Sequence, residues 1–213
     1  MGGRGLVAVK VLMHLLALTP TVLLVVAVGL DKAGGDPVQY IIHFTGKGAL
    51  NALIATLLIT PIARRFGWSW LMQCRRLVGL YVMFYAALHI SAFIALDLVF
   101  DVKLLASEIL KRPYISIGFI AFVIVTALAI TSLKSIRKNM GKNWQLLHGS
   151  VYPLALLVVW HYYWSVRSDV VEPIFYGVAV LLLLWARWPK VSQWLQAMRR
   201  ACAKKAAPVN SVR

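Results

Sequence analysis

The segment "LLHGSVYPLALLVVWHYYW" (residues 146–164) is apolar enough to lie in lipid, yet it carries two histidines, His148 and His161. An apolar run of about 20 residues is enough to span the hydrocarbon core of a bilayer as a helix. Several further runs of this kind occur in the 213-residue chain, which is 61% hydrophobic with a mean hydropathy of +0.76. Soluble domains are only about 45–50% apolar, so the sequence predicts an integral membrane protein.

Six apolar segments are predicted to cross the membrane, at about residues 8–30, 46–63, 77–97, 113–133, 145–166 and 171–188. All seven acidic residues fall in the loops after the first, third and fifth segments: Asp31, Asp36, Asp97, Asp101, Glu108, Asp169 and Glu172. The other side of the membrane receives 17 of the 23 lysines and arginines. Because cytoplasmic loops of membrane proteins are enriched in lysine and arginine, we expect an all-α six-helix bundle with both termini in the cytoplasm.

The net charge of +16 would suit a nucleic-acid partner, but its placement on one side of the membrane makes it a topology signal instead. We predict a transmembrane domain over residues 1–190 and a basic amphipathic cytoplasmic tail over residues 191–213. Cys74 and Cys202 both map to the cytoplasmic side, where two unpaired thiols indicate neither a disulfide framework nor a metal cluster. The outer loop at residues 100–113 contains a candidate short amphipathic surface helix.

Two histidines are predicted to lie at the same depth in the membrane. His89 precedes Asp97 by eight residues, and His161 precedes Asp169 by eight residues. With a rise of ~1.5 Å per residue, each ring lies about 12 Å below the outer charged rim. Two imidazoles at one depth on two helices suit the axial ligands of a b-type haem. The chain has no CxxCH attachment sequence, so such a haem would be bound non-covalently.

The role of His148, near the inner surface, is open between a second redox site and a hydrogen-bonded neutral ring. At 100° per residue, the thirteen residues between His148 and His161 place the two rings on different faces of one helix. A kink at Pro153 would bring the rings closer to one face. Counting thirteen residues back from His89 gives Arg76 instead of a second histidine. His14 is at a suitable depth to replace it, although a packed, hydrogen-bonded His14 is the better interpretation.

Other polar residues near the two surfaces are ambiguous. Arg75 and Arg76 suit haem propionates or a flavin phosphate, but charges that set the topology explain them better. His43, at the outer rim, could contact a periplasmic partner, a quinone or a propionate, or cap its helix together with Thr45. The aromatic residues around His161 suit either a haem edge or the aromatic belt of the membrane surface.

The chain resembles the MsrQ family (formerly YedZ), the haem-binding membrane subunits of bacterial periplasmic methionine sulfoxide reductases. MsrQ belongs to the wider ferric reductase-like transmembrane group. The segments that carry this resemblance are "GGDPVQYIIHFTGKGALNALIATLLITPIARR" (34–65), "RRLVGLYVMFYAALHISAF" (75–93), "KRPYISIGFI" (111–120) and "GKNWQLLHGSVYPLALLVVWHYYWSV" (141–166). The resemblance covers nearly the whole chain up to about residue 190.

The resemblance implies that His89, His148 and His161 are the haem-associated histidines. Family members with two haems carry two histidines on each of two helices, and Arg76 departs from that pattern. The resemblance therefore implies one or two b-type haems, together with an FMN whose site the sequence does not locate. It also implies a periplasmic molybdenum-cofactor reductase, MsrP, as the partner.

These observations predict an inner-membrane cytochrome that passes electrons outward. The donor would be quinol or a cytoplasmic flavin reductase, because no nucleotide-binding domain is fused to the membrane core. The acceptor would be the molybdoenzyme that reduces methionine sulfoxide in oxidised envelope proteins, so we expect no catalytic residue in this chain. One alternative is a stand-alone transmembrane ferric reductase. A less favoured one is a transporter that uses the histidines as a proton relay.

Overall fold

The computed structural model describes residues 3–166 and 169–206, and these residues form helices joined by short connections. The helices are α1 (Gly3–Gly29), α2 (Pro37–Phe66), α3 (Ser69–Ala92), α4 (Val102–Lys111), α5 (Pro113–Ile130), α6 (Lys134–Met140), α7 (Lys142–His148), α8 (Val151–Ser165), α9 (Val171–Ala186) and α10 (Trp188–Ala206), with a π-helical turn, η1 (Phe93–Asp97), after α3. The described residues confirm the prediction that the chain is all-α.

The longest helix, α2, begins and ends at residues suited to those positions. The Asp36 carboxylate accepts a hydrogen bond from the backbone N–H of Gln39, and Pro37 occupies the first helical position. At the other end, Gly67 adopts a left-handed conformation with φ 69°. A side chain is strained there, so glycine ends the helix and lets the chain turn directly into α3.

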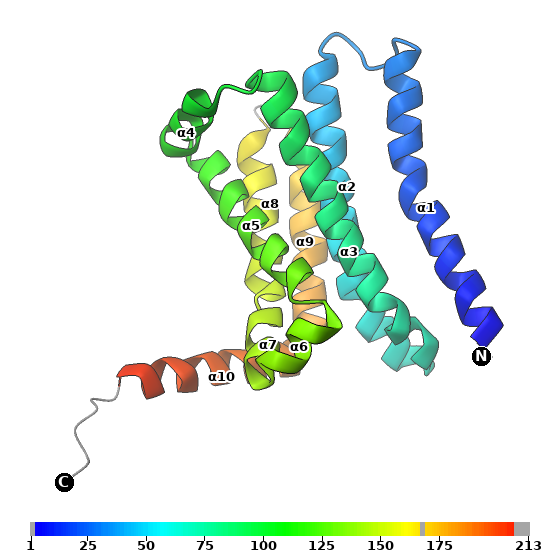
Figure 1. Ribbon diagram of the computed structural model, residues 1–213, viewed down its shortest axis with the longest axis vertical. Helices are drawn as coiled ribbons and strands as arrows, with labels where there is room; N and C mark the ends of the chain where they lie inside the picture. Colours follow the sequence, from blue (N-terminus) through cyan, green and yellow to red (C-terminus); the bar gives the residue numbers. More distant parts are fainter. Residues whose placement is uncertain (1–2, 167–168, 207–213) are drawn as a thin grey trace.

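The helices form a bundle whose core lies between α2, α3, α5, α8 and α9 (Figure 1). Large aliphatic side chains fill this core, with Leu50, Leu53, Leu57, Leu154 and Val180 each at most 2% exposed. The first helix, α1, stands at the edge of the bundle and exposes most of its aliphatic side chains. An apolar helix with an exposed apolar surface is expected where the surrounding solvent is lipid.

Four described helices are long and apolar enough to cross a membrane: Arg4–Gly29, Pro37–Phe66, Ser69–Asp97 (α3 with η1) and Pro113–Ile130. A fifth candidate is the pair α9 and α10, if it counts as one span bent by 79°. α8, with 15 residues, is shorter than these spans. The predicted count of six spans is thus supported for four of them and remains a prediction for the rest.

The connections gather at two opposite ends of the bundle (Figure 1). We call one the acidic end, because it holds the seven acidic residues, and the other the basic end, which holds the α2–α3 turn, α6, α7 and α10. The start of α1 and the whole of α10 lie at the basic end. This separation agrees with the predicted alternation of loops, and the cytoplasmic position of the basic end remains a prediction.

The structure corrects the prediction of one kinked helix over residues 145–166. The helix is broken at Gly149 and Ser150, which separate α7 from α8, and the break does not lie at Pro153. Pro153 is the third residue of α8, in the first turn, where helices do not need its missing N–H group. His148 and His161 therefore belong to two different helices.

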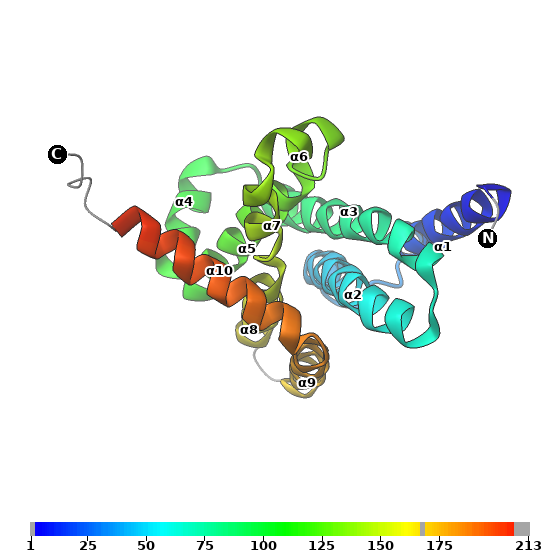
Figure 2. The ribbon, with the colours of Figure 1, turned by 90° about the horizontal axis from the view of Figure 1, so that it is seen from below.

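Both predicted amphipathic segments are helical. The outer-loop segment forms α4, whose N-terminus is capped by Asp101. The basic tail forms α10, which crosses the base of the bundle, as seen from below in Figure 2. Trp194 of α10 attaches it to α7 by donating its indole N–H to the carbonyl oxygen of Leu146 at 2.7 Å. Residues 207–213 of the predicted tail lie outside the described residues.

The attachment of α10 makes Gly149 sensitive to substitution. A Cβ atom at position 149 would overlap the rigid indole of Trp194, so Gly149→Ala is expected to displace α10 and to destabilise the protein by about 1–3 kcal/mol. Gly79→Ala is the matched control, because its Cβ would lie 3.9 Å from the nearest atom, in Thr56. Thermal unfolding in detergent should give a lower midpoint for Gly149→Ala than for Gly79→Ala. Equal midpoints would contradict the proposed packing of Trp194.

Candidate functional site

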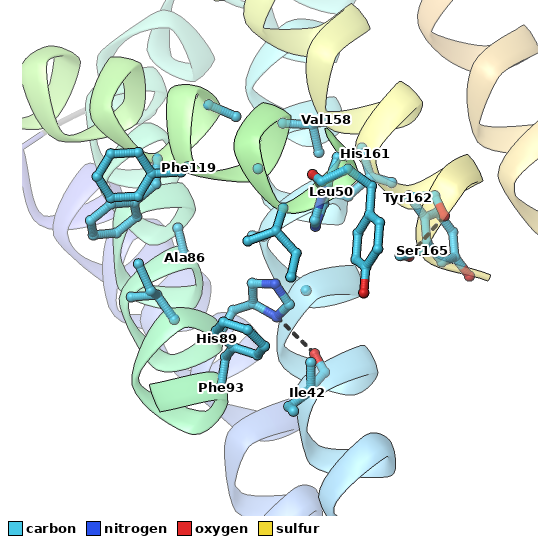
Figure 3. A pocket seen from close by; sticks show the side chains of 18 of the residues that line it. Ile42, Leu50, Ala86, His89, Phe93, Phe119, Val158, His161, Tyr162 and Ser165 are labelled. Carbon is cyan, nitrogen blue, oxygen red and sulfur yellow. Dashed lines mark hydrogen bonds between the residues drawn. The ribbon is translucent and has the colours of Figure 1, made fainter. Parts of the chain in front are cut away.

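The centre of the candidate site is a pair of histidines between α3 and α8. The ring centroids of His89 and His161 lie 6.1 Å apart with an interplanar angle of 79°. Both rings line a cavity of about 240 Å³ inside the bundle (Figure 3). The predicted match in depth, based on the equal spacing of the two histidines from Asp97 and Asp169, is confirmed by this proximity.

A backbone carbonyl holds each ring by the same nitrogen. His89 Nδ1 lies 2.9 Å from the carbonyl oxygen of Ile42, and His161 Nδ1 lies 2.7 Å from that of Tyr114. A carbonyl oxygen only accepts hydrogen bonds, so Nδ1 carries the proton in each ring and donates it. In the neutral rings this leaves both Nε2 atoms with a free lone pair. This is the arrangement found in metal-binding histidines, whose second nitrogen is held by a carbonyl or carboxylate.

A glycine lies beside each ring, four residues after the residue whose carbonyl holds it. Gly46 follows Ile42 on α2, and Gly118 follows Tyr114 on α5. A Cβ atom at Gly46 would approach His89 to 3.1 Å, and one at Gly118 would approach His161 to 2.7 Å. α2 and α5 thus contact their histidines in the same way. One turn of the helix provides the carbonyl that accepts the hydrogen bond, and the glycine in the next turn leaves space for the imidazole.

Gly46 and Gly118 were not among the site residues predicted from the sequence. The sequence feature that could have indicated them is the presence of glycine inside apolar helices. Glycine at such a position destabilises a helix by about 0.5–1 kcal/mol relative to alanine and therefore usually has a packing reason. What could not be inferred from the sequence is which histidine each glycine faces. The two contacts join residues 43 positions apart along the chain.

The cavity changes from apolar to polar along its length. Its deep part is lined by aliphatic and aromatic side chains such as Leu53, Val82 and Phe122. Toward the acidic end its lining includes polar and charged side chains, namely Gln39, His43, Lys47, Asp97, Arg112 and Ser165. A flat ligand with an apolar body and anionic groups on one edge would match this distribution.

Two of the cations at the polar end are held in place. Lys47 Nζ lies 3.3 Å from a carboxylate oxygen of Glu172, and Arg112 Nε lies 2.7 Å from one of Glu108. The Arg112 guanidinium also donates a hydrogen bond to the Tyr114 hydroxyl, which raises the pKa of Arg112, so this side chain stays charged. His43 also lines the cavity at this end, as its predicted position at a rim requires, and the assignment of this rim to the outer side remains a prediction.

The remaining histidines lie elsewhere. His148 is stacked on Trp144, with ring centroids 4.0 Å apart, and its Nε2 lies 3.0 Å from the hydroxyl oxygen of Thr131, the residue after α5. His14 Nδ1 lies 2.6 Å from the hydroxyl oxygen of Tyr81. Each of the two rings therefore has a hydrogen-bond partner. A role of His148 in a second site stays a prediction.

The amino-acid sequence that forms this bundle and its histidine pair is similar to those of known proteins. Residues 45–159 match the family described as "Ferric reductase like transmembrane component". The chain is 42% identical over 186 residues to the "Protein-methionine-sulfoxide reductase heme-binding subunit MsrQ" of Pectobacterium atrosepticum, covering 87% of this chain and 94% of that protein. It is 41% identical over 211 residues to the protein of the same name from Xanthomonas euvesicatoria, covering 96% and 97%.

The class of protein that these findings define is a multi-pass integral membrane protein, consistent with the bacterial inner membrane. Within that class, the chain belongs to the ferric reductase-like transmembrane family and, more narrowly, to the family of MsrQ subunits. His89 and His148 fall inside the matched range of the broader family, and His161 lies two residues beyond it.

The residues of the cavity fit a haem. Two imidazoles on opposite sides of one metal ion have ring centroids about 6 Å apart. Each nitrogen–metal bond is about 2 Å long, and the centre of each ring lies further back, behind its nitrogen. The observed 6.1 Å and the two free Nε2 atoms meet this requirement. The apolar depth suits the porphyrin body, and the cations toward the acidic end suit its carboxylates.

Proposed function

We propose that this chain is the haem-carrying membrane subunit of a methionine sulfoxide reductase system and that it delivers electrons across the membrane to a periplasmic molybdenum-cofactor reductase, MsrP. The observation that carries the proposal is the His89–His161 pair, with both Nδ1 atoms bonded to carbonyls and both Nε2 atoms free. The names of the relatives support the cofactor and the reductase system. We also propose six spans with both termini in the cytoplasm.

In this proposal His89 and His161 would hold a b-type haem, which would supply one-electron transfer. The carbonyls of Ile42 and Tyr114 keep each Nδ1 protonated, which leaves Nε2 free to bind a metal and raises its basicity. Aliphatic residues around the pair would exclude water. Lys47 and Arg112, which are paired with Glu172 and Glu108, would be the cations available to the haem carboxylates at the acidic end.

We propose opposite ends of the bundle for the partner and for the electron donor. We propose that MsrP docks on the acidic end, on the loops around residues 34–47 and 101–112, because the polar side of the cavity lies there. The donor would be quinol from the membrane or a cytoplasmic flavin reductase at the basic end. His148 would serve a second haem at that end. FMN remains a proposal from family resemblance alone.

The proposal is tested first by the spectrum of the purified protein. Expression with haem supplied should give a reduced-minus-oxidised difference spectrum of low-spin b type and at least one haem per chain by extraction. Two haems per chain would add His148 to the ligands. A folded but colourless protein would contradict the proposal and would favour a histidine relay in a transporter.

Electron delivery is tested with the chemically reduced protein. Mixed with purified MsrP and a methionine sulfoxide substrate, it should be reoxidised much faster than with either component alone. A ferric chelate without any protein partner is the comparison. Fast reoxidation by the chelate, and none by MsrP, would contradict the proposed partner and would make the chain a metalloreductase.

A further inference from the structure

A buried arginine at the basic end of the bundle has two nitrogen atoms without a hydrogen-bond partner among the described residues. Arg187, between α9 and α10, is only 4% exposed. Among the described residues, neither its Nε nor its Nη1 atom has a hydrogen-bond partner, and both are fully covered. A buried guanidinium without an anion is costly, because it has lost its water without regaining an opposite charge.

More positive charge surrounds this arginine. Arg75 lies close enough for its charge to act on that of Arg187, and Tyr152 is a neutral neighbour. Burial lowers the pKa of Lys190, and the charges of Arg64, Arg75 and Arg187 add to that effect. At neutral pH the Arg187 group stays protonated, so several cations share a small region without neutralising one another.

A second buried polar group lies at the same end. Thr60, in the last part of α2, is 3% exposed, and its hydroxyl has no partner among the described residues. Thr45, Thr56, Thr126 and Thr131, by contrast, each bond a carbonyl one turn earlier. Leu57 of α2 and Leu183 of α9 belong to the same core cluster. Thr60 comes one turn after Leu57, and Arg187 comes one turn after Leu183, so both lie further toward the basic end.

The chain has no acidic side chain that could neutralise these cations. No acidic residue lies between Asp36 and Asp97, between Glu108 and Asp169, or after Glu172. Arg187 follows the C-terminus of α9, where the helix dipole favours a cation, and precedes the N-terminus of α10, where it favours an anion. The two dipoles oppose each other, so an anion from outside the chain would supply the compensating charge.

We propose that the basic end carries a binding site for a phosphate group, formed by Arg187, Arg75 and Lys190. Arg64 extends the site at its exposed rim, and the Thr60 and Tyr152 hydroxyls are available as neutral donors. Phosphate is the anion that a guanidinium binds with two parallel hydrogen bonds. The phosphate belongs either to the headgroup of an anionic phospholipid, which basic pockets between membrane helices bind, or to a soluble phosphate. The site is separate from the cavity of His89 and His161, while its Arg75 also lies near His148.

The test measures the stabilisation of the purified full-length protein by a phosphate group. Thermal unfolding is followed by tryptophan fluorescence in phosphatidylcholine micelles, with increasing phosphatidylglycerol in one series and increasing inorganic phosphate in another. A ligand that binds only the folded state raises the unfolding midpoint. We expect the wild type to respond and Arg187→Gln to need about 10- to 100-fold more ligand for the same rise, because it loses charged hydrogen bonds.

The control is Lys138→Gln, which removes one positive charge from exposed Lys138 on α6, at the same end of the bundle. It should respond as the wild type does. Arg187→Met, which removes the charge and keeps the length of the side chain, replaces Arg187→Gln if that variant does not fold. A response to phosphatidylglycerol alone assigns the site to lipid, and a response to inorganic phosphate as well assigns it to any phosphate group. Equal responses of the wild type and the Arg187 variants, or no response of the wild type, would overturn the proposal.

Discussion

Alanine at position 89 or 161 is expected to remove nearly all haem from the purified protein. Each substitution deletes one of the two Nε2 atoms proposed to bind the haem and removes the hydrogen bond from that ring to the carbonyl of Ile42 or Tyr114. Loss of only a hydrogen-bond partner behind a ligand typically weakens metal binding about 10- to 100-fold, so loss of the ligand itself should exceed this. Haem extraction and the reduced-minus-oxidised spectrum of His89→Ala and His161→Ala measure the effect.

His14→Ala is the matched control for this experiment. It also removes an imidazole from a predicted span, but one that contacts Tyr81 instead of the cavity. It should keep its haem, and added imidazole should partly restore the spectrum of His161→Ala by filling the vacated position. Full haem content in both His89→Ala and His161→Ala would exclude this pair as the axial ligands.

The second large effect is expected from Gly118→Ala. The new Cβ would lie 2.7 Å from Cε1 and 2.8 Å from Nδ1 of His161, closer than real Cβ contacts allow. The ring must move, and movement breaks its hydrogen bond to the Tyr114 carbonyl. We expect haem affinity to fall about 10- to 100-fold, as for other losses of a ligand's hydrogen-bond partner, with a shift of the haem absorption bands in the fraction that still binds.

Alanine substitutions at two other glycines should have smaller effects on haem affinity, in proportion to the space available. A Cβ at Gly46 would lie 3.1 Å from His89, so Gly46→Ala should have a smaller effect on haem affinity than Gly118→Ala. Gly79→Ala, with 3.9 Å of space, should have none. Haem titration of the three apo-proteins measures the order. An equal effect of all three substitutions would indicate a general loss of stability and would refute a specific displacement of His161.

The histidine pair shows how far spacing along the chain predicts a site. His89 and His161 could be matched in depth because each precedes an acidic residue at the membrane surface by eight residues, and helical rise is constant. Depth says nothing about the direction in which a ring points. The facing of the two rings and the protonation of Nδ1 depend on carbonyls of α2 and α5, which are distant in sequence.

The basic end of the bundle shows a feature that spacing along the chain does not predict. In the sequence Arg187 is only one of the 17 cations on the predicted inner side, because the sequence gives no measure of its burial. In the structure α10 turns sharply away from α9, and the turn buries this side chain among other cations. The break between α7 and α8 was misplaced for a similar reason. Proline at the start of a helix is tolerated, and the glycine beneath Trp194 is where the helix is interrupted.

The sequence by itself determined the membrane class, the apolar segments and the separation of charge between the two ends, because lipid demands long apolar helices and charge bias accompanies topology. It also determined the two histidines of the candidate site and, through its motifs, the family. Only the tertiary structure decided which nitrogen of each ring is free, which glycines make room for the rings, and that Arg187 is buried with two nitrogens unpaired within the described part of the chain. These features arise from contacts between helices far apart in the chain, and no local pattern encodes such contacts.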